Sequence, residues 1–242
     1  MWIAEITYFK NSCRIQGGHL ASSENKVYYI RIPKAASTTL CKTILHAKFP
    51  VLQAQQLSAR QINFLADLHL EKKMRQQKTF EIFTVVRNPF ARIVSVYREF
   101  FEKRNEPFIY EDYLFGIFRR DFSFQKFVET VERIPDHLKD QHLKPQHFFI
   151  RYYQRNNIAV KMMKLEEPET IHAFLRDRGL AFEVFNQSSR PYDYPRYYDP
   201  ETLKAVASIY QTDILRFGYQ GIIKELQFMV EHRHVQIWTK RE

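Results

Sequence analysis

A near-continuous apolar run that leads directly into a helix signal constrains the fold more than any other feature. Residues 80–86 read FEIFTVV, which predicts a strand buried on both faces, as in a parallel sheet. Asn88 is a favourable N-cap residue, and Pro89 suits the first turn of a helix. From Phe90 to Phe101, apolar side chains recur at helical spacing. These features predict a strand–turn–helix unit, which is typical of an α/β fold.

Two further strand–helix pairs support the same fold class. Residues 27–32, VYYIRI, are rich in β-branched and aromatic side chains and predict a strand, and residues 37–47 predict a helix. A third strand is predicted at 158–165, followed by a helix at 168–178 that Gly179 ends. The alternation of strands and helices predicts an α/β fold with a mainly parallel central sheet flanked by helices.

The chain is expected to form a single domain over its 242 residues. It shows no internal repeat and no low-complexity tract. Residues 1–26 are expected to be an irregular N-terminal segment, and residues 221–242 a C-terminal helix or tail. Further helices are predicted at 58–77, 122–131 and 200–217.

The charge balance indicates an anionic partner. The chain carries 37 Lys and Arg against 27 Asp and Glu, a formal net charge of +10. Such a surplus favours a nucleotide, an acidic glycan, a nucleic acid or an anionic lipid, without choosing among them. A content of 45% hydrophobic residues excludes a generally disordered chain.

The cysteines and the first residues favour a cytoplasmic location. Cys13 and Cys41 are too few for a disulfide framework and are expected to be free thiols in a reducing compartment. The first twenty residues contain Glu5, Lys10 and Arg14 and no apolar core of signal-peptide length. No apolar run approaches the length of a transmembrane segment, so none is expected.

The turn after the first strand is a candidate phosphate site. A helix N-terminus offers unpaired N–H groups and partial positive charge, and one lysine and three hydroxyls add further donors. The order differs from that of a nucleotide-triphosphatase loop, because the lysine precedes the hydroxyls and no glycine is present. The alternative is a capped helix beside a surface lysine. The segment consists of Pro33, Lys34, Ala35, Ala36, Ser37, Thr38 and Thr39.

Arg87 and Ser95 form a second candidate phosphate element. Arg87 closes the buried strand at the edge of the sheet where ligands of open α/β sheets bind, and its planar fork matches a phosphate. The alternative is that Arg87 pairs with a carboxylate and that Ser95 is a small packing residue. In metal-dependent kinases and ATPases an Asp commonly holds magnesium at this place. Arg87 there indicates a nucleotide with an extra phosphate and no required metal.

Together these elements resemble the PAPS-dependent sulfotransferases of the carbohydrate type, where PAPS is 3′-phosphoadenosine 5′-phosphosulfate. That family includes the heparan 2-O- and chondroitin 4-O-sulfotransferases and shorter bacterial members. The resemblance runs in order from about residue 27 to 220. Four segments carry it, namely IPKAASTTL at 32–40, VVRNPFARIVSVYREF at 85–100, HLKPQ at 142–146, and YYDPETLKAVASIYQTDILRFGY at 197–219.

The resemblance implies a P-loop-like sulfotransferase fold and transfer of the sulfuryl group of PAPS to a hydroxyl. The acceptor would be a saccharide or a glycolipid, PAP (3′,5′-ADP) would be released, and no metal would be required. By family position, Lys34 contacts the leaving 5′-phosphate and the bridging oxygen, and residues 35–39 cradle that phosphate. Arg87 and Ser95 hold the 3′-phosphate. Ser37 replaces a glycine frequent in the family loop, and its small side chain should still admit the phosphate.

The general base for the acceptor hydroxyl is less clear in the sequence. Short relatives often carry a His before a TAREI-like stretch, and this chain has Gln56 there, which cannot take a proton. The substitutes are His142 and His69, with His46 as a further candidate, and each has a structural role as its alternative. Glu166 matches a Glu common in relatives and is expected to orient loops.

Several other residues admit two interpretations. Arg92, one helical turn before Ser95, is expected to pair with a nearby acid. The tyrosines and arginines of residues 190–198 either stack on adenine or a sugar, or pack in the core. Residues 188–190 are a further candidate for closing over the cofactor, and the basic residues 72–78 are a solvated helix end or a contact for an acidic glycan.

Histidines elsewhere predict no metal site. His137, His142 and His147 recur every five residues and share neither a helix face nor a strand face. His232 and His234 are expected to belong to a solvated basic tail.

Three alternatives to an active sulfotransferase stay open. The first is a sulfotransferase fold that binds PAP, PAPS or a sulfated glycan without turnover, because Gln56 replaces a base. The second is a P-loop kinase-like enzyme, which the missing glycines and magnesium carboxylate disfavour. The third is a nucleic-acid-binding module, which net charge alone supports, so no nucleic-acid partner is expected. The acceptor and the oligomeric state are left open.

Overall fold

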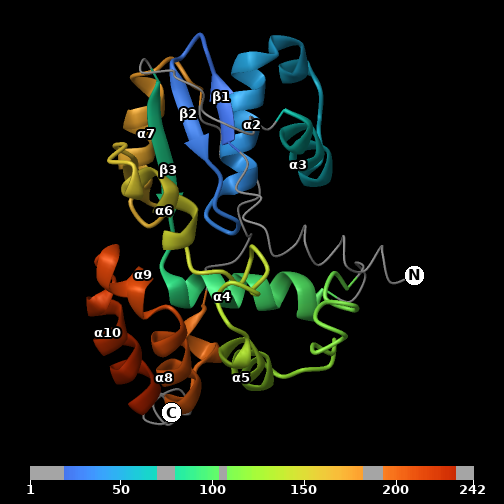
Figure 1. Cartoon of the computed structure of the whole chain (residues 1–242), viewed down its shortest axis with the longest axis vertical. Coiled ribbons are helices and arrows are strands. Elements are labelled where there is room, and N and C mark those ends of the chain that lie inside the picture. Colours follow the sequence, from blue (N-terminus) through green and yellow to red (C-terminus); the bar gives the residue numbers. More distant parts are fainter. Residues whose placement is uncertain (1–18, 70–79, 104–107, 182–192, 233–242) are drawn as a thin grey trace, which may run out of the picture. The chain divides into compact units, whose positions relative to one another are not determined.

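The computed structural model describes residues 19–69, 80–103, 108–181 and 193–232 (Figure 1). The chain divides into two compact units, and each is described by itself. The sheet unit comprises residues 15–87 and 148–191. The helical unit comprises residues 1–14, 88–147 and 192–242.

The sheet unit is built on a mainly parallel sheet, as the sequence predicts. Its four strands lie in the order β1-β2-β3-β4, with β2 parallel to β3 and β3 parallel to β4. Strand β1 pairs antiparallel with β2 at one edge. The strands are β1 (His19–Ser22), β2 (Val27–Ile30), β3 (Glu81–Val86) and β4 (Lys161–Lys164).

Three helices pack on one face of this sheet. Side chains alternate between the two faces of a strand, so Tyr29 and its partner Phe83 point to the same face. Both join a buried cluster with apolar residues of α2 (Ser37–Lys48), α3 (Ala59–Leu68) and α7 (Pro168–Arg176). Their rings stack with centroids 5.1 Å apart.

Helix α6 (His147–Arg155) contributes to the other face. There the Tyr153 hydroxyl lies 3.0 Å from Nε2 of His19, and the His19 ring lies 4.9 Å from that of Tyr28. The sheet is therefore covered by helices on both faces, which confirms the α/β architecture.

Local capping explains where several helices begin. The Asn88 side chain accepts a hydrogen bond from the backbone of Phe90, as the sequence predicts for the helix that starts at Pro89. Ser58 and Gln61 form a capping box at the start of α3. Asp199 and Thr202 form another at the start of α8 (Pro200–Ile209).

The helical unit consists of helices around an aromatic core. The backbone beyond α4 continues as one π-helical turn, residues 98–102. Phe101 and Phe127 lie 4.8 Å apart between ring centroids, and both are buried. Its main helices are α4 (Pro89–Tyr97), α5 (Phe124–Arg133), α8, α9 (Gln211–Arg216) and α10 (Gln220–Glu231).

The structure differs from the sequence-based expectations at four places. Strand β1 lies in the segment expected to be irregular, because HLAS is short and pairing with β2 decides its conformation. Helix α6 was not predicted, and the third predicted strand is shortened to β4. The helix predicted at 200–217 is divided at Tyr210 into α8 and α9.

The short edge strand β1 carries a histidine whose charge the fold disfavours. Burial lowers the pKa of His19 to about 4, against an ordinary value of 6.5. Between these two values the unfolded chain binds a proton that the folded chain does not. The free energy of unfolding should therefore rise with pH across this range, by about 3 kcal/mol from this residue.

We expect His19→Gln to flatten this rise, because glutamine does not titrate. Urea unfolding midpoints at several pH values between 4 and 7 measure it. His172→Gln, which changes an exposed histidine of α7, is the control and should keep the wild-type slope. An unchanged slope in His19→Gln would contradict the prediction.

Candidate functional site

Parallel pairing brings the ends of two strands to one edge of the sheet unit. Strands β2 and β3 pair in parallel, with Tyr29 opposite Phe83, so their carboxyl ends lie at the same edge of the sheet. The Thr84 hydroxyl donates a 2.8 Å hydrogen bond to the carbonyl of Ile30, which joins the strands near their carboxyl ends. Ligands of open α/β sheets bind at such an edge. The turn before α2 follows β2 at this edge, and Arg87 follows β3 there.

The turn before α2 has a backbone conformation that suits an anion. Lys34 has a φ of 67° and Ala36 a φ of 57°, so both lie in the left-handed region that non-glycine residues seldom adopt. The Ala35 N–H donates to the Ile32 carbonyl at 3.3 Å, which closes the turn. Left-handed residues are one component of the backbone nests that bind anions. Ser37 begins α2 in helical conformation and therefore needs no glycine.

Helix α2 begins without a side-chain cap. Ala36 occupies the N-cap position, and its methyl group cannot accept a hydrogen bond from the first turn. The first turn also contains no acidic residue. Neither a capping side chain nor an acidic residue of the first turn offsets the partial positive charge of this helix end.

Arg87 contacts the candidate phosphate turn. Its Nη1 donates a 3.0 Å hydrogen bond to the carbonyl oxygen of Lys34. Arg87 and Lys34 are both half-buried. The structure thus brings together these two residues that the sequence analysis assigned to separate phosphate elements.

The hydroxyls of the turn differ in their surroundings. Thr39 is buried, and the Thr38 hydroxyl donates to Oδ1 of Asn63 at 3.4 Å. Nη2 of Arg31 donates to the same oxygen at 3.0 Å, and its Nη1 bonds Asp67 at 2.6 Å. Asn63 and Arg31 therefore connect α3 to the turn. Neither was predicted from the sequence, because nothing in their spacing marks a contact of α3 with the segment between β2 and α2.

The other predicted 3′-phosphate residue, Ser95, lies on α4 in the helical unit and is half-buried. Arg92 on the same helix is 1% exposed. Its Nη1 donates to the Lys144 carbonyl at 3.0 Å, and its Nη2 to the Gln141 carbonyl at 3.2 Å. Burial lowers the pKa of Arg92, opposed by the nearby negative charge of Asp213 and other groups.

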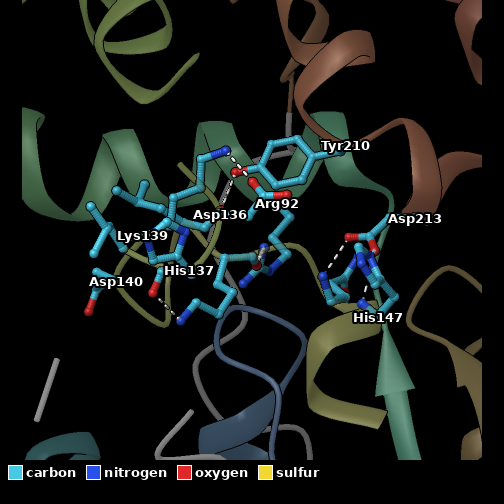
Figure 2. A network of polar contacts seen from close by, with 12 residues as sticks. Arg92, Asp136, His137, Lys139, Asp140, His147, Tyr210 and Asp213 are labelled. Atoms are coloured by element: carbon cyan, nitrogen blue, oxygen red, sulfur yellow. Dashed lines mark hydrogen bonds and ion pairs between the residues drawn. The ribbon is translucent and has the colours of Figure 1, made fainter. Parts of the chain in front are cut away.

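A buried carboxylate joins two separated segments of the helical unit (Figure 2). Asp213 has no exposed surface, and its oxygens accept the backbone N–H groups of Gln146 at 2.6 Å and His147 at 2.9 Å. Its Oδ1 also lies 2.8 Å from Nδ1 of His147. The Tyr210 hydroxyl donates to the Leu143 carbonyl at 2.8 Å. Segments 142–146 and 197–219, which carry the family resemblance, are thus tied together.

His142 is held by a second buried carboxylate. Its Nδ1 lies 2.8 Å from Oδ1 of Asp140, and its backbone N–H donates to the same oxygen at 2.9 Å. The Tyr110 hydroxyl donates to that oxygen at 3.0 Å. Burial raises the pKa of Asp140, but the contacts with His142 and Tyr110 outweigh it and lower the pKa below its ordinary value. The His142 ring packs against Phe100 with centroids 5.0 Å apart.

The other candidate bases lie in the sheet unit. His69 is the C-cap residue of α3, and its ring packs against Phe49 with centroids 4.6 Å apart. His46 is half-buried in the last turn of α2. Gln56 and Glu166 are exposed.

The described tyrosines of the aromatic–basic loop make packing contacts. The buried Tyr198 donates its hydroxyl to the Phe90 carbonyl at 2.9 Å. The Tyr197 hydroxyl donates to Glu102 at 2.7 Å, and Tyr194 accepts a hydrogen bond from Asn88 at 3.0 Å. These contacts fit the packing interpretation for the described part of the loop.

Several predicted features lie outside the described residues. They are Cys13, the basic residues 72–78, residues 188–192 and His234. Cys41 is a buried free thiol, and burial raises its pKa to about 11. Within the described part of the chain, no group of three or more His, Cys, Asp or Glu side chains is placed to hold a metal ion. Among the described helices, none combines the length and apolar character that crossing a membrane requires.

Removal of the Asp213 carboxylate should destabilise the helical unit. In Asp213→Ala the N–H groups of Gln146 and His147 lose a buried, charged acceptor. We expect a loss of about 2–4 kcal/mol in the free energy of unfolding. Chemical denaturation measures the loss, and hydrogen exchange should be faster at both amides. Asp121→Ala, which removes an exposed carboxylate paired with Arg119, should change stability by less than about 1 kcal/mol.

Comparison with known proteins gives one match. A family model described as the sulfotransferase family matches residues 19–220. The matched span begins with β1 and ends at the first residue of α10, so it contains both candidate phosphate elements. No curated protein and no solved structure matches the chain.

Proposed function

The chain belongs to the sulfotransferase family, and from this premise we propose that it transfers the sulfuryl group of PAPS to a hydroxyl. The products are a sulfate ester and PAP. A saccharide or a glycolipid is the proposed acceptor class, in line with the resemblance to carbohydrate-type members. The proposal includes no metal requirement, because Arg87 rather than a carboxylate follows β3.

One observation carries the donor assignment. Lys34 and Ala36 of the turn are left-handed, the helix that follows has no capping side chain, and Arg87 donates a hydrogen bond to the same turn. No acidic residue in the first turn of α2 opposes a phosphate there. These residues fit the 5′-phosphosulfate of PAPS in charge and in backbone geometry.

Each residue of the proposed donor site has a distinct part. When bound, PAPS supplies an activated sulfate whose leaving group is the 5′-phosphate of PAP. Lys34 offsets the negative charge that develops as the sulfur–oxygen bond breaks. The N–H groups of residues 36–39 hold the 5′-phosphate, because the Ala35 N–H is already donated to the Ile32 carbonyl. Hydroxyls of the same segment are further donors. Arg87 and Ser95 are assigned to the 3′-phosphate, which distinguishes PAPS from ordinary adenine nucleotides.

The acceptor hydroxyl needs a proton acceptor, for which His142 and His69 are the candidates. The geometry favours His142, because a buried carboxylate holds its Nδ1. The ring of His69 instead packs on Phe49. We therefore propose His142 as the base, and a Gln at position 56 then does not preclude activity.

The second candidate function is binding without turnover, which the exposed Gln56 motivates. Such a protein would hold PAP or a sulfated glycan and transfer nothing. The kinase-like alternative predicts a preference for ATP with magnesium over PAP. A cytoplasmic location, expected from the cysteines, stays a prediction.

Calorimetric titration with PAP, ADP and AMP in the presence of EDTA tests the donor site. We expect the protein to prefer PAP, because Arg87 is assigned to its 3′-phosphate. Arg87→Ala should weaken PAP binding by about 10- to 100-fold, the range for a lost hydrogen bond to a charged group. Arg176→Ala removes an exposed arginine of α7 in the same unit and should bind PAP as the wild type does.

Two outcomes would contradict the donor assignment. Equal affinity for the three nucleotides would show that the 3′-phosphate is not recognised. Preference for ATP with magnesium would favour the kinase-like alternative. Selective PAP binding without sulfuryl transfer to any acceptor would support the binding-only function.

Lys34 should matter more for turnover than for nucleotide affinity. Lys34→Asn removes the charge, and asparagine tolerates the left-handed backbone at this position. We expect kcat to fall by about 10²–10³-fold, as for loss of one transition-state donor. Transfer of ³⁵S from labelled PAPS to p-nitrophenyl glycosides measures this loss. Lys204→Asn, an exposed change on α8, should leave kcat unaltered, and equal loss in both variants would argue against the role.

A further inference from the structure

One oxygen atom of the helical unit collects three hydrogen bonds around His142. Oδ1 of Asp140 accepts the backbone N–H of His142 at 2.9 Å and the Tyr110 hydroxyl at 3.0 Å. It also lies 2.8 Å from Nδ1 of the His142 ring. Backbone and ring of His142 are thus attached to the same atom, which restricts how the ring can turn.

This contact defines which ring nitrogen carries the proton. A carboxylate only accepts hydrogen bonds, and a neutral imidazole has one N–H and one bare nitrogen. The proton therefore belongs on Nδ1, where it is donated to Asp140, and Nε2 carries the free lone pair. The His142 side chain is 21% exposed, so the ring is not sealed in the core.

The carboxylate of Asp140 is itself held from several directions. Its side chain is 7% exposed, and Tyr110 is 1% exposed. The Asp140 N–H donates to the Tyr113 hydroxyl at 2.8 Å, and that hydroxyl donates to the Leu138 carbonyl at 2.6 Å. Two buried tyrosines therefore fix the backbone and the side chain of Asp140.

We infer that Asp140 and Tyr110 are positioning residues that hold His142 as the Nδ1–H tautomer, with Nε2 as the acceptor of the proton from the hydroxyl substrate. The inference rests on the proposed function and deepens it. Neither positioning residue touches the reacting atoms, since both act through His142.

The proposed step balances without a further reactant. The oxygen of the acceptor hydroxyl forms a bond to sulfur, and the bond from sulfur to the bridging oxygen of PAPS breaks. The electron pair of that bond stays on the 5′-phosphate of PAP. The hydroxyl proton moves to Nε2 of His142, and Asp140 stabilises the resulting imidazolium.

The His142 ring also has an aromatic neighbour. Phe100 contacts one side of the ring. The nearby cation Arg92 donates to the carbonyls of Gln141 and Lys144. Asp140 is thus the charged group that hydrogen-bonds to the ring.

The other histidine–carboxylate pair of this unit has a different role. Asp213 uses its two oxygens on the backbone N–H groups of Gln146 and His147, at the start of α6. It has no exposed surface and joins two chain segments. We therefore assign the proton transfer to His142, and we assign a structural role to His147.

The tautomer can be measured without any turnover. Two-bond ¹H–¹⁵N spectra of histidine-labelled protein, assigned with His142→Gln, distinguish a protonated Nδ1 from a protonated Nε2. We expect His142 to show Nδ1–H in the wild type and a mixture of tautomers in Asp140→Asn. A wild-type ring protonated on Nε2 would overturn the inference.

Kinetics separate a positioning role from a structural one. Transfer of ³⁵S from PAPS to p-nitrophenyl glycosides should fall by about 10²–10⁴-fold in kcat for His142→Gln, the range for a general base. In Asp140→Asn, kcat should fall by part of that factor, and in Tyr110→Phe it should fall by about tenfold. The KM for PAPS should be unchanged in both variants.

Matched controls come from the same unit. Tyr97→Phe removes a hydroxyl that donates to the Phe122 carbonyl and not to Asp140, and it should keep wild-type kcat. His137→Gln removes an exposed histidine and should do the same. Circular dichroism and PAP calorimetry show whether each variant is folded.

The outcomes distinguish failure of this inference from failure of the proposed function. A wild-type protein that binds no PAP overturns the proposed function and the inference with it. A protein that binds PAP and transfers sulfate, while Asp140→Asn and His142→Gln keep kcat, overturns the inference alone. A protein that binds PAP and transfers nothing overturns the catalytic role of His142 and leaves the donor site standing.

Discussion

The parallel pairing of β2 with β3 is the constraint on which the candidate donor site depends. Because the two strands run in the same direction, the turn before α2 and Arg87 begin at one edge of the sheet. An antiparallel pairing would place them at opposite edges. The hydrogen bond from Arg87 to the Lys34 carbonyl is a consequence of this pairing. It joins two elements that lie more than fifty residues apart in the chain.

The turn before α2 adopts left-handed backbone conformations although it contains no glycine. Phosphate-binding turns usually rely on glycine for left-handed conformations, and this turn has none. Lys34 and Ala36 adopt these conformations, at a cost of order 1 kcal/mol each. Packing of β2 and α2 in the core holds the turn in place. Such strain is common at ligand-binding sites, where it prepares the backbone for the ligand.

Buried carboxylates organise the helical unit in a comparable way. Asp213 and Asp140 are both buried, and each accepts backbone N–H groups as well as a histidine side chain. A buried charge is tolerated only when it is paired or hydrogen-bonded, so these contacts are conditions for the fold. The same contacts orient two imidazole rings. At His142, the contacts that the fold requires therefore also orient the ring that is proposed to accept a proton.

The sequence by itself determined the α/β class and the main strands and helices, and it predicted two phosphate-binding elements. Their signals are local, since apolar periodicity, Asn88 and the loop order can be read within a few turns of chain. Only the tertiary structure decided the conformation of β1, the contact of Arg87 with Lys34, and that a carboxylate holds His142 among the candidate bases. Those features depend on residues far apart in the chain, such as the Tyr110 hydroxyl that meets Asp140. The spacing of residues along the sequence does not predict such contacts, because they form only when the whole unit packs.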